Sequence, residues 1–180
     1  MAARALEFTI LTVARSGETW KEIDFKGKLW NVPKERMKAG APHTVPLSIE
    51  ALAILEALHE QRQEGQEFIF TRDGENPLSN MAMMMLLRRM KQTEITVHGF
   101  RSGFRDWCGD ATSFPREVAE AALAHKVGDE TERAYRRSDA PKGKAHGLCR
   151  HGRFTCEAIE QRKEIAALVA EARRTAAAVV

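Results

Sequence analysis

The sequence has little of what defines several protein classes. It contains no run of about 18 or more apolar residues, so it predicts no membrane span. The N-terminus does not show the charged, apolar and small-residue succession of a signal peptide. The three cysteines are an odd number at irregular spacing, which favours a reducing cytosol over a disulfide framework. The 180 residues, of which 43% are hydrophobic, are enough for one ordinary domain with a buried core and perhaps a tail.

The excess of charge of one sign is also small, since the formal net charge is only +3. The cations nevertheless gather in groups along the chain. These groups are Arg88, Arg89 and Lys91, then Arg101 and Arg105, then Arg133, Arg136 and Arg137. Such groups suit a polyanion, and they also occur as ordinary solvated helix faces. The charge therefore permits nucleic-acid binding without requiring it.

Hydrophobic periodicity predicts a mainly α-helical protein with a small antiparallel β-sheet, which is an α+β fold. Residues 29–32 and 44–47 are expected to form a hairpin with a long turn at 33–42, and Pro46 favours an edge position for the second strand. A short strand is expected at 68–70. Helices are expected at 5–14 (starting almost at Met1), from Ser48 to Gly65, from Ser79 to about Met90, from His98 to about Asp110, from Pro115 to Leu123, and after Asp129.

The character of the chain changes after Ala140. Residues 141–155 are rich in glycine and basic residues and predict a flexible linker, whereas residues 156–180 predict a C-terminal amphipathic helix. The linker region includes His146, Cys149 and His151, and Cys156 follows, but their spacing is not that of a recognised zinc finger. We therefore expect an incidental linker and no metal site.

A small set of polar residues can carry phosphoryl chemistry. Tyr135 is the only tyrosine in the chain, and a lone phenol near histidines and arginines is a candidate nucleophile. The full set, in chain order, is Arg15, Lys38, His98, Arg101, His125 and Tyr135. Each member also has a structural interpretation. His98 and Arg101 share a helix face by spacing alone, Lys38 stands in one turn with Lys34 and Arg36, His125 can cap a helix, and Tyr135 can be a packing residue.

The order of these six residues, and the strings around them, resemble the catalytic domain of tyrosine recombinases, specifically phage-type integrases. The matching strings include ARSGE at 14–18, ERMKAGAPHTVPL at 35–47, HGFR at 98–101 and FPREVAEAALAHKVGDETERAYRRSD at 114–139. The likeness extends from Leu6 to Asp139. It implies a fold like the catalytic core of DNA breaking-and-rejoining enzymes, with a catalytic domain at 1–140 and no core-binding domain before it.

The resemblance implies site-specific recombination or integration through a 3′-phosphotyrosyl intermediate. Arg15 and Arg101 would hold the non-bridging phosphate oxygens, and Tyr135 would attack the phosphorus. Lys38 would protonate the leaving 5′ oxygen, His98 would accept the tyrosine proton or orient the phosphate, and His125 would donate a hydrogen bond to a phosphate oxygen. No cofactor is implied, because the covalent link conserves the bond energy.

The implied partner is double-stranded DNA, with self-association into a tetrameric synapse as in the family, in the bacterial cytoplasm at the nucleoid. The expected DNA-binding residues are Lys34, Arg36, Arg88, Arg89, Arg105, Arg136 and Arg137. The family usually has about four more residues between Glu18 and Trp20, close to one helical turn of about 3.6 residues, so we expect Arg15 near the site but poorly supported. Two other functions remain open: a non-catalytic remnant that binds DNA weakly, and an interaction module acting through the tail helix.

Overall fold

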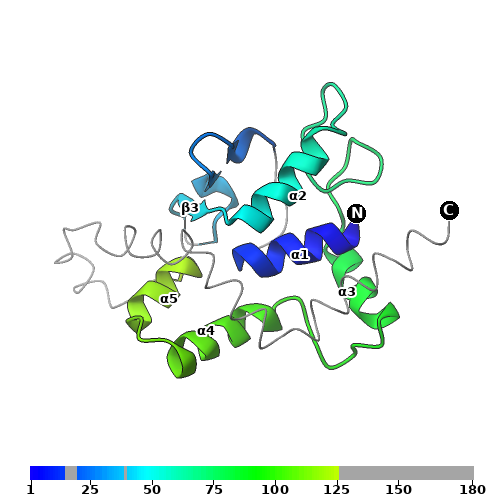
Figure 1. The fold of residues 1–180 in the computed structure, drawn as a ribbon. Coiled ribbons are helices and arrows are strands. Elements are labelled where there is room, and N and C mark those ends of the chain that lie inside the picture. The colour runs from blue at the N-terminus through cyan, green and yellow to red at the C-terminus, as the bar shows by residue number, and fades with distance from the viewer. Residues whose placement is uncertain (15–19, 39, 126–180) are drawn as a thin grey trace.

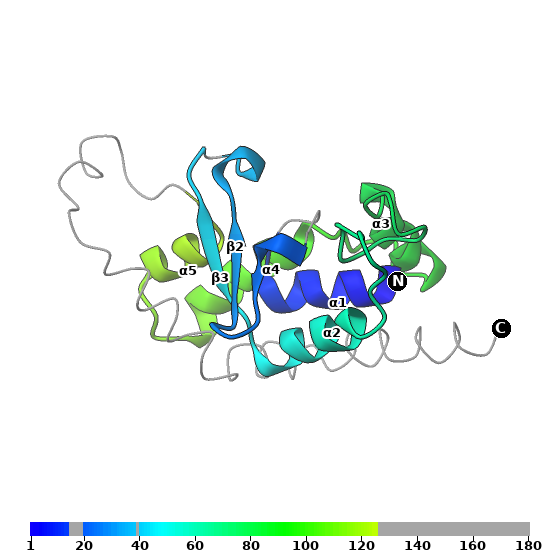
Figure 2. The same ribbon diagram turned by 90° about the horizontal axis from the view of Figure 1, so that it is seen from above.

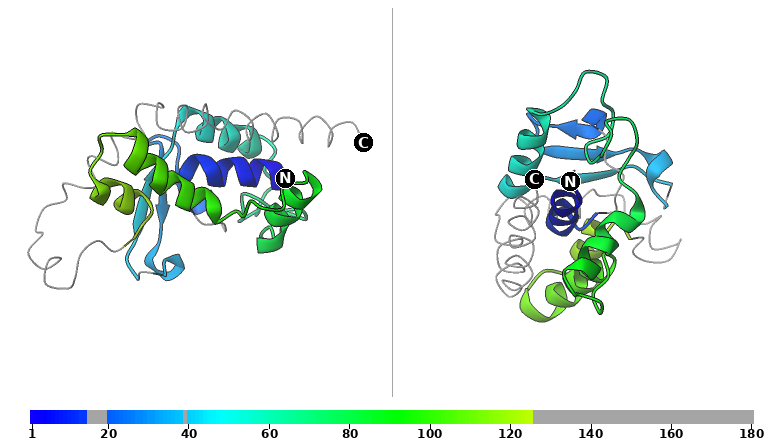
Figure 3. Two further views of the ribbon diagram at one scale, coloured as in Figure 1. Left: turned by 90° about the horizontal axis from the view of Figure 1, so that it is seen from below. Right: turned by 90° about the vertical axis from the view of Figure 1, so that its right-hand side faces the viewer.

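Helix α1 (Ala2–Thr12) runs through the middle of the molecule in this computed structural model, which describes residues 1–14, 20–38 and 40–125. Helix α2 (Ile49–His59) packs along one side of it, and α3 (Asn80–Arg89) packs near its N-terminal end (Figure 1). Helices α4 (Gly99–Ala111) and α5 (Arg116–Ala122) contact each other and lie on the side of α1 opposite α2 (Figure 3). This order places α3 and α5 at opposite ends of the domain.

A small antiparallel sheet stands beside these helices. Its strands are β1 (Ile23–Asp24), β2 (Leu29–Val32) and β3 (His43–Pro46), in the order β1-β2-β3. Trp30 pairs with Val45 and Val32 pairs with His43. Trp30, Val32 and Val45 are buried, because alternate side chains of a strand point to the same face. The β2–β3 hairpin projects past the helices (Figure 2).

The predicted fold class is confirmed, and so are most of the element positions. Strand β2 occupies the predicted residues 29–32, and β3 is an edge strand that begins one residue before the predicted start. Ser48 caps α2 as predicted, since its hydroxyl accepts a hydrogen bond from the backbone N–H of Ala51 at 3.2 Å. The left-handed residue Gly65, however, lies in a later turn, because α2 already ends at His59.

The predicted strand at 68–70 is wrong. Phe68 makes a single bridge, residues 69–70 form a bend, and the next pairing along the described chain is an isolated bridge between Thr71 and Pro77. Ile69 and Phe70 are both buried although they are adjacent, which a half-exposed strand would not allow. Phe70 packs on Phe8 of α1 at a ring distance of 5.5 Å. The apolar run is therefore a buried loop and not a strand.

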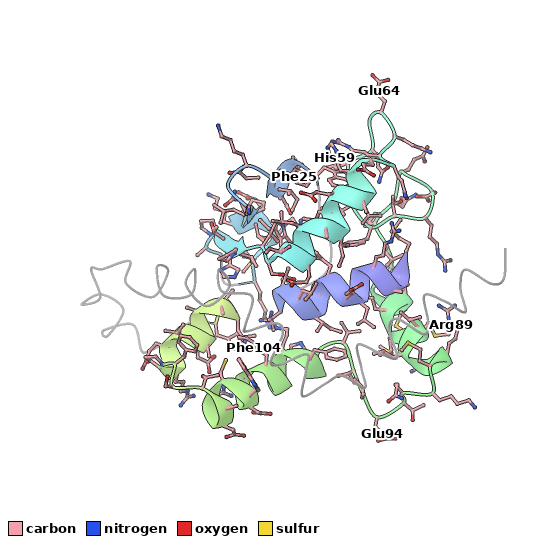
Figure 4. All side chains as sticks on the ribbon, in the orientation of Figure 1. Phe25, His59, Glu64, Arg89, Glu94 and Phe104 are labelled. Atoms are coloured by element: carbon pink, nitrogen blue, oxygen red, sulfur yellow. The ribbon has the colours of Figure 1, made fainter. Side chains whose placement is uncertain are left out.

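The core is divided into two clusters that meet at the C-terminal end of α1. The larger cluster joins α1, α2, α3 and the hairpin around Phe8 and Trp30, whose ring centroids are 5.6 Å apart. The smaller cluster joins Val13, just after α1, to α4 and α5. Its buried members are Val13, Phe104, Cys108, Val118, Ala119 and Leu123. Figure 4 shows Phe104 on the side of α4 that faces the rest of the domain. The smaller cluster thus packs α4 and α5 against the residue that follows α1.

Two features are absent from the described residues. None of the helices within 1–14, 20–38 and 40–125 has the length and apolar character needed to cross a membrane. In the same part of the chain, no three histidine, cysteine or acidic side chains gather as metal ligands would. The four zinc-type residues considered above, at 146, 149, 151 and 156, lie outside it.

Candidate active site

A small pocket lies where the β2–β3 hairpin meets the helical part of the domain. Its cavity of about 50 Å³ has room for a water molecule or a small polar group. Its lining comes from the end of α1, the hairpin, the first turn of α4 and the end of α5. The lining residues are Ala14, Trp30, Val32, Arg36, Met37, His43, Arg101, Ala122, Leu123 and Ala124.

Arg101 is the central polar group of this pocket. It projects from the first turn of α4 and is 6% exposed. Its Nη1 donates to the backbone carbonyl of Val13, and its Nη2 donates to the carbonyl of Leu123 at 2.5 Å. Hydrogen bonds from a charged donor are roughly twice as strong as neutral ones. One guanidinium therefore ties the end of α1 to the end of α5.

Both helix ends that Arg101 holds have a left-handed residue. Val13, the C-terminal cap of α1, has a φ of 53°, and Ala124, which follows α5, also has a φ of 53°. A β-branched residue in this region is a genuine outlier, and such strain persists only where the surroundings hold it. His125 directly follows the left-handed Ala124, and Arg15 is two residues after Val13 in the sequence. The burial of Arg101 against both ends explains why they keep this conformation.

The hairpin side of the pocket is held by a buried carboxylate. Glu22 is 5% exposed and accepts a hydrogen bond from Trp30 Nε1 at 3.0 Å. Nη1 of Arg36 lies 2.7 Å from Glu22 Oε1 and 2.5 Å from Oε2. Because buried charges are costly unless they are paired, this contact fixes the short 3-10 helix at Lys34–Arg36. The exposed Lys38 follows two residues later, before Gly40 turns the chain with a φ of 68°.

His43 is a pocket residue that our sequence analysis did not single out. It opens β3 and lines the cavity together with Arg36 and Arg101. Burial lowers its pKa, the nearby guanidinium of Arg101 lowers it further, and a hydrogen bond with the backbone of Ala122 acts in the opposite direction. His43 is thus favoured as a neutral ring. The only signal in the sequence was its place at the end of the hairpin turn that carries Lys38.

His125 lies just beyond α5 and contacts a buried carboxylate. Its Nδ1 is 2.6 Å from Oε2 of Glu120, and its side chain is 42% exposed. Oε1 of Glu120 pairs with Arg105 Nε at 2.7 Å, and Arg116 lies farther off at 3.7 Å. Burial acts to raise the pKa of Glu120, but the hydrogen bond with His125 and the charge of Arg105 outweigh it, so the pKa lies below the ordinary value.

One of the six predicted catalytic residues is part of the pocket lining, and three others are next in the sequence to lining residues. Arg101 lines it, and Arg15, Lys38 and His125 directly follow the lining residues Ala14, Met37 and Ala124. His98 is exposed at the N-cap of α4, one turn before Arg101. Arg15 and Tyr135 themselves lie outside the described residues, so the structure does not locate either of their side chains.

The family comparison covers all the residues of this pocket. The profile of the phage integrase family matches residues 3–141. The chain belongs to the phage integrase family. It is 41% identical over 147 residues to "Prophage integrase IntA" of Escherichia coli strain K12, an alignment that covers 77% of this chain and 35% of that protein. It is 30% identical over 156 residues to "Integrase" of Enterobacteria phage P4, covering 75% and 35%.

The relatives are longer than this integrase-family chain. A third one, "Integrase" of Shigella phage Sf6, is 25% identical over 139 residues, covering 75% of this chain and 36% of its own length. The chain thus spans about a third of the length of the curated relatives that it matches. No solved structure gives a significant match.

Within the described part of this integrase-family domain, the predicted DNA-binding residues do not form one patch. Arg36 and Arg105 are paired with Glu22 and Glu120, whereas Lys34 is exposed beside the pocket. Arg88 and Arg89 are exposed on α3, at the end of the domain away from α5, where Figure 4 labels Arg89. Arg136 and Arg137 lie outside the described residues. Contact of all of them with one duplex remains a prediction.

Proposed function

We propose that this chain carries the catalytic domain of a tyrosine recombinase, which breaks and rejoins double-stranded DNA for site-specific recombination. Membership of the phage integrase family supports the reaction class. The pocket supports the location, since residues far apart in sequence bring Arg101 together with the residues that immediately precede Arg15, Lys38 and His125. That convergence is the observation on which the proposal mainly rests.

The proposed reaction is a phosphoryl transfer without a metal ion. The Tyr135 hydroxyl oxygen attacks the scissile phosphorus and loses its proton to His98. The bond from phosphorus to the 5′ oxygen breaks, and Lys38 supplies the proton that this oxygen takes up. The 3′-phosphotyrosyl link is later attacked by a 5′-hydroxyl, which reverses the step. The phenol is a suitable leaving group in that reversal, because its pKa of about 10 is well below that of an alcohol.

Arg15 and Arg101 would stabilise the charge that develops on the non-bridging oxygens, and His125 would donate a further hydrogen bond. A guanidinium carries five N–H donors in a rigid fork. Arg101 can therefore hold backbone carbonyls and a phosphate oxygen at the same time, and its backbone contacts would set its direction before DNA arrives. Preorganised donors of this kind cost no rearrangement during the reaction.

The domain organisation and the assembly are part of this proposal. Residues 1–140 would form the catalytic domain, residues 141–155 a linker and residues 156–180 a helix. Because the matches cover only about a third of the relatives' length, the function of a whole recombinase would need further DNA-binding surface. Phosphate contacts dominate DNA affinity, so this domain alone would bind DNA weakly and with strong salt dependence. Four copies on two DNA duplexes would form the synapse.

The test uses a pool of DNA duplexes of random sequence, each nicked just 3′ of a position to be cleaved. Cleavage would release a short 5′-hydroxyl fragment that diffuses away, so the covalent protein–DNA adduct accumulates and survives SDS. The expected result is an adduct with the unaltered chain and none with Tyr135→Phe. An adduct that persists in Tyr135→Phe would refute the assignment of the nucleophile. DNA binding without any adduct would favour the non-catalytic remnant.

A further inference from the structure

Glu120 is a buried carboxylate to which the reaction above gives no role. It lies on α5, its side chain is 10% exposed, and it faces His125 through Oε2 and Arg105 through Oε1. A buried carboxylate is costly unless charged or hydrogen-bonding partners compensate it. Glu120 has two such partners, on opposite sides, and one of them is a predicted catalytic residue.

The backbone brings His125 back onto Glu120. After α5, the N–H of Ala124 donates to the carbonyl of Ala121 at 3.0 Å, and the N–H of His125 donates to the carbonyl of Glu120 at 2.9 Å. These two bonds and the left-handed Ala124 form a Schellman motif, which ends a helix by reversing the chain. The same two residues are therefore joined twice, by a backbone hydrogen bond and by a side-chain hydrogen bond.

The charge state of Glu120 decides how the His125 ring is protonated. The lowered pKa of Glu120 keeps it ionised at neutral pH, and an ionised carboxylate only accepts hydrogen bonds. At 2.6 Å, Nδ1 of His125 must therefore be the donor and carry a proton. The other ring nitrogen, Nε2, is then the one left to face a substrate, as in other sites where the partner of one nitrogen sets the role of the second.

We infer that Glu120 is a positioning residue, which fixes the ring orientation and the Nδ1–H tautomer of His125 while Arg105 holds its other oxygen. With Nδ1 committed to the carboxylate, Nε2 can donate to a phosphate oxygen only when the ring carries both protons. This last consequence rests on the proposed function, whereas the orientation and the tautomer do not.

Arg105 consequently has a different role from the one that the charge pattern predicts. Its Nε is 2.7 Å from Glu120 Oε1, which makes its guanidinium an ion-pair partner of the carboxylate without the geometry of a hydrogen bond. Its side chain is 47% exposed, so part of it remains accessible. The order Arg105, Glu120, His125 runs from the middle of α4 across α5 to the pocket rim.

The test of the orientation is ¹⁵N NMR of the His125 ring in the folded chain, at a pH where the ring is neutral. The unaltered chain should show a proton on Nδ1 and none on Nε2. Glu120→Ala should convert most of the ring to the Nε2–H form. Glu120→Gln keeps the side-chain volume and is the second variant to use if Glu120→Ala does not fold. Its amide offers both a donor and an acceptor, so it should give a mixture of the two ring tautomers. Glu117→Gln, on the same helix, is the control and should leave the ring unchanged.

The functional part is tested by the rate of adduct formation on nicked DNA. Glu120→Gln should slow the single-turnover rate at saturating DNA by about tenfold, the lower end of the range for removing a partner that orients a functional histidine. The apparent Kd for DNA should stay the same. An unchanged Nδ1–H tautomer in Glu120→Ala overturns the inference, and so does an unchanged rate in Glu120→Gln. Absence of adduct in the unaltered chain would instead refute the proposed function, and the NMR result would still decide the orientation.

Discussion

Replacement of Arg101 by lysine is predicted to destabilise the domain, before any question of catalysis arises. The guanidinium donates to the carbonyls of Val13 and Leu123 from two separate nitrogens. A lysine ammonium is a single point charge and cannot span both acceptors. One buried carbonyl would therefore lose its donor, and each hydrogen bond from a charged group contributes about 1.5–3 kcal/mol. We expect Arg101→Lys to lower the free energy of unfolding by about 2 kcal/mol, and Arg101→Ala by about 3–4 kcal/mol.

The measurement is urea unfolding followed by the fluorescence of the buried tryptophans. Hydrogen exchange of the His125 amide, which donates to the carbonyl of Glu120, adds a local readout and should accelerate in Arg101→Lys. Arg89→Lys, an exposed site on α3, is the matched control and should change stability by no more than about 0.5 kcal/mol. If Arg101→Lys stays within about 0.5 kcal/mol of the unaltered chain, Arg101 does not hold the helix ends as we argue.

Three further outcomes follow from buried polar groups. Arg36→Met should cost about 3 kcal/mol in urea unfolding, because it leaves the Glu22 carboxylate buried without its cation, and adding Glu22→Gln should recover at least half of the loss. Burial raises the pKa of the Cys108 thiol to about 12, so mass spectrometry should find it unlabelled by a thiol reagent at pH 7 in the folded chain and labelled in urea. The pKa of Glu120 is lowered on folding, so its stabilising effect is fully present above the ordinary glutamate pKa of about 4.3 and is lost as pH falls through the lower folded pKa. The stability difference between the unaltered chain and Glu120→Gln should accordingly shrink with acidification, and a constant difference from pH 6 to pH 3 would contradict this account.

Local patterns in the sequence predicted the elements well where one physical signal dominated. Strand β2 was predicted at its observed residues because its neighbours are turn-forming and Trp30 and Val32 alternate with more exposed positions. Ser48 was predicted as a helix cap for the chemical reason that its hydroxyl bonds the Ala51 amide. The strand at 68–70 failed because a short apolar run looks the same whether it is a strand or a buried loop. Its burial depends on Phe8, which is remote in sequence.

The candidate site also contains both residues that the sequence singled out and residues that it did not. The resemblance to phage-type integrases singled out Arg101 and His125, whereas the residue types alone left structural interpretations open. The roles of Glu120 and His43 were not predicted, because each depends on a partner that only the tertiary structure supplies. For His43 the partners are Arg101 and the backbone of Ala122, and for Glu120 one of them is Arg105 on a different helix. A glutamate in a helix has no sequence signal that separates it from a solvated one.

The deeper reason is that the pocket is assembled through the backbone. A left-handed valine costs free energy, as does a left-handed alanine, since Cβ crowds the following carbonyl. Burying a guanidinium is also unfavourable by itself. The same hydrogen bonds compensate both costs, because the turns present the carbonyls of Val13 and Leu123 to Arg101, and Arg101 donates to both. Neither feature is stable without the other, so the helix ends that lead to Arg15 and His125 should move together when Arg101 is changed, and not one at a time.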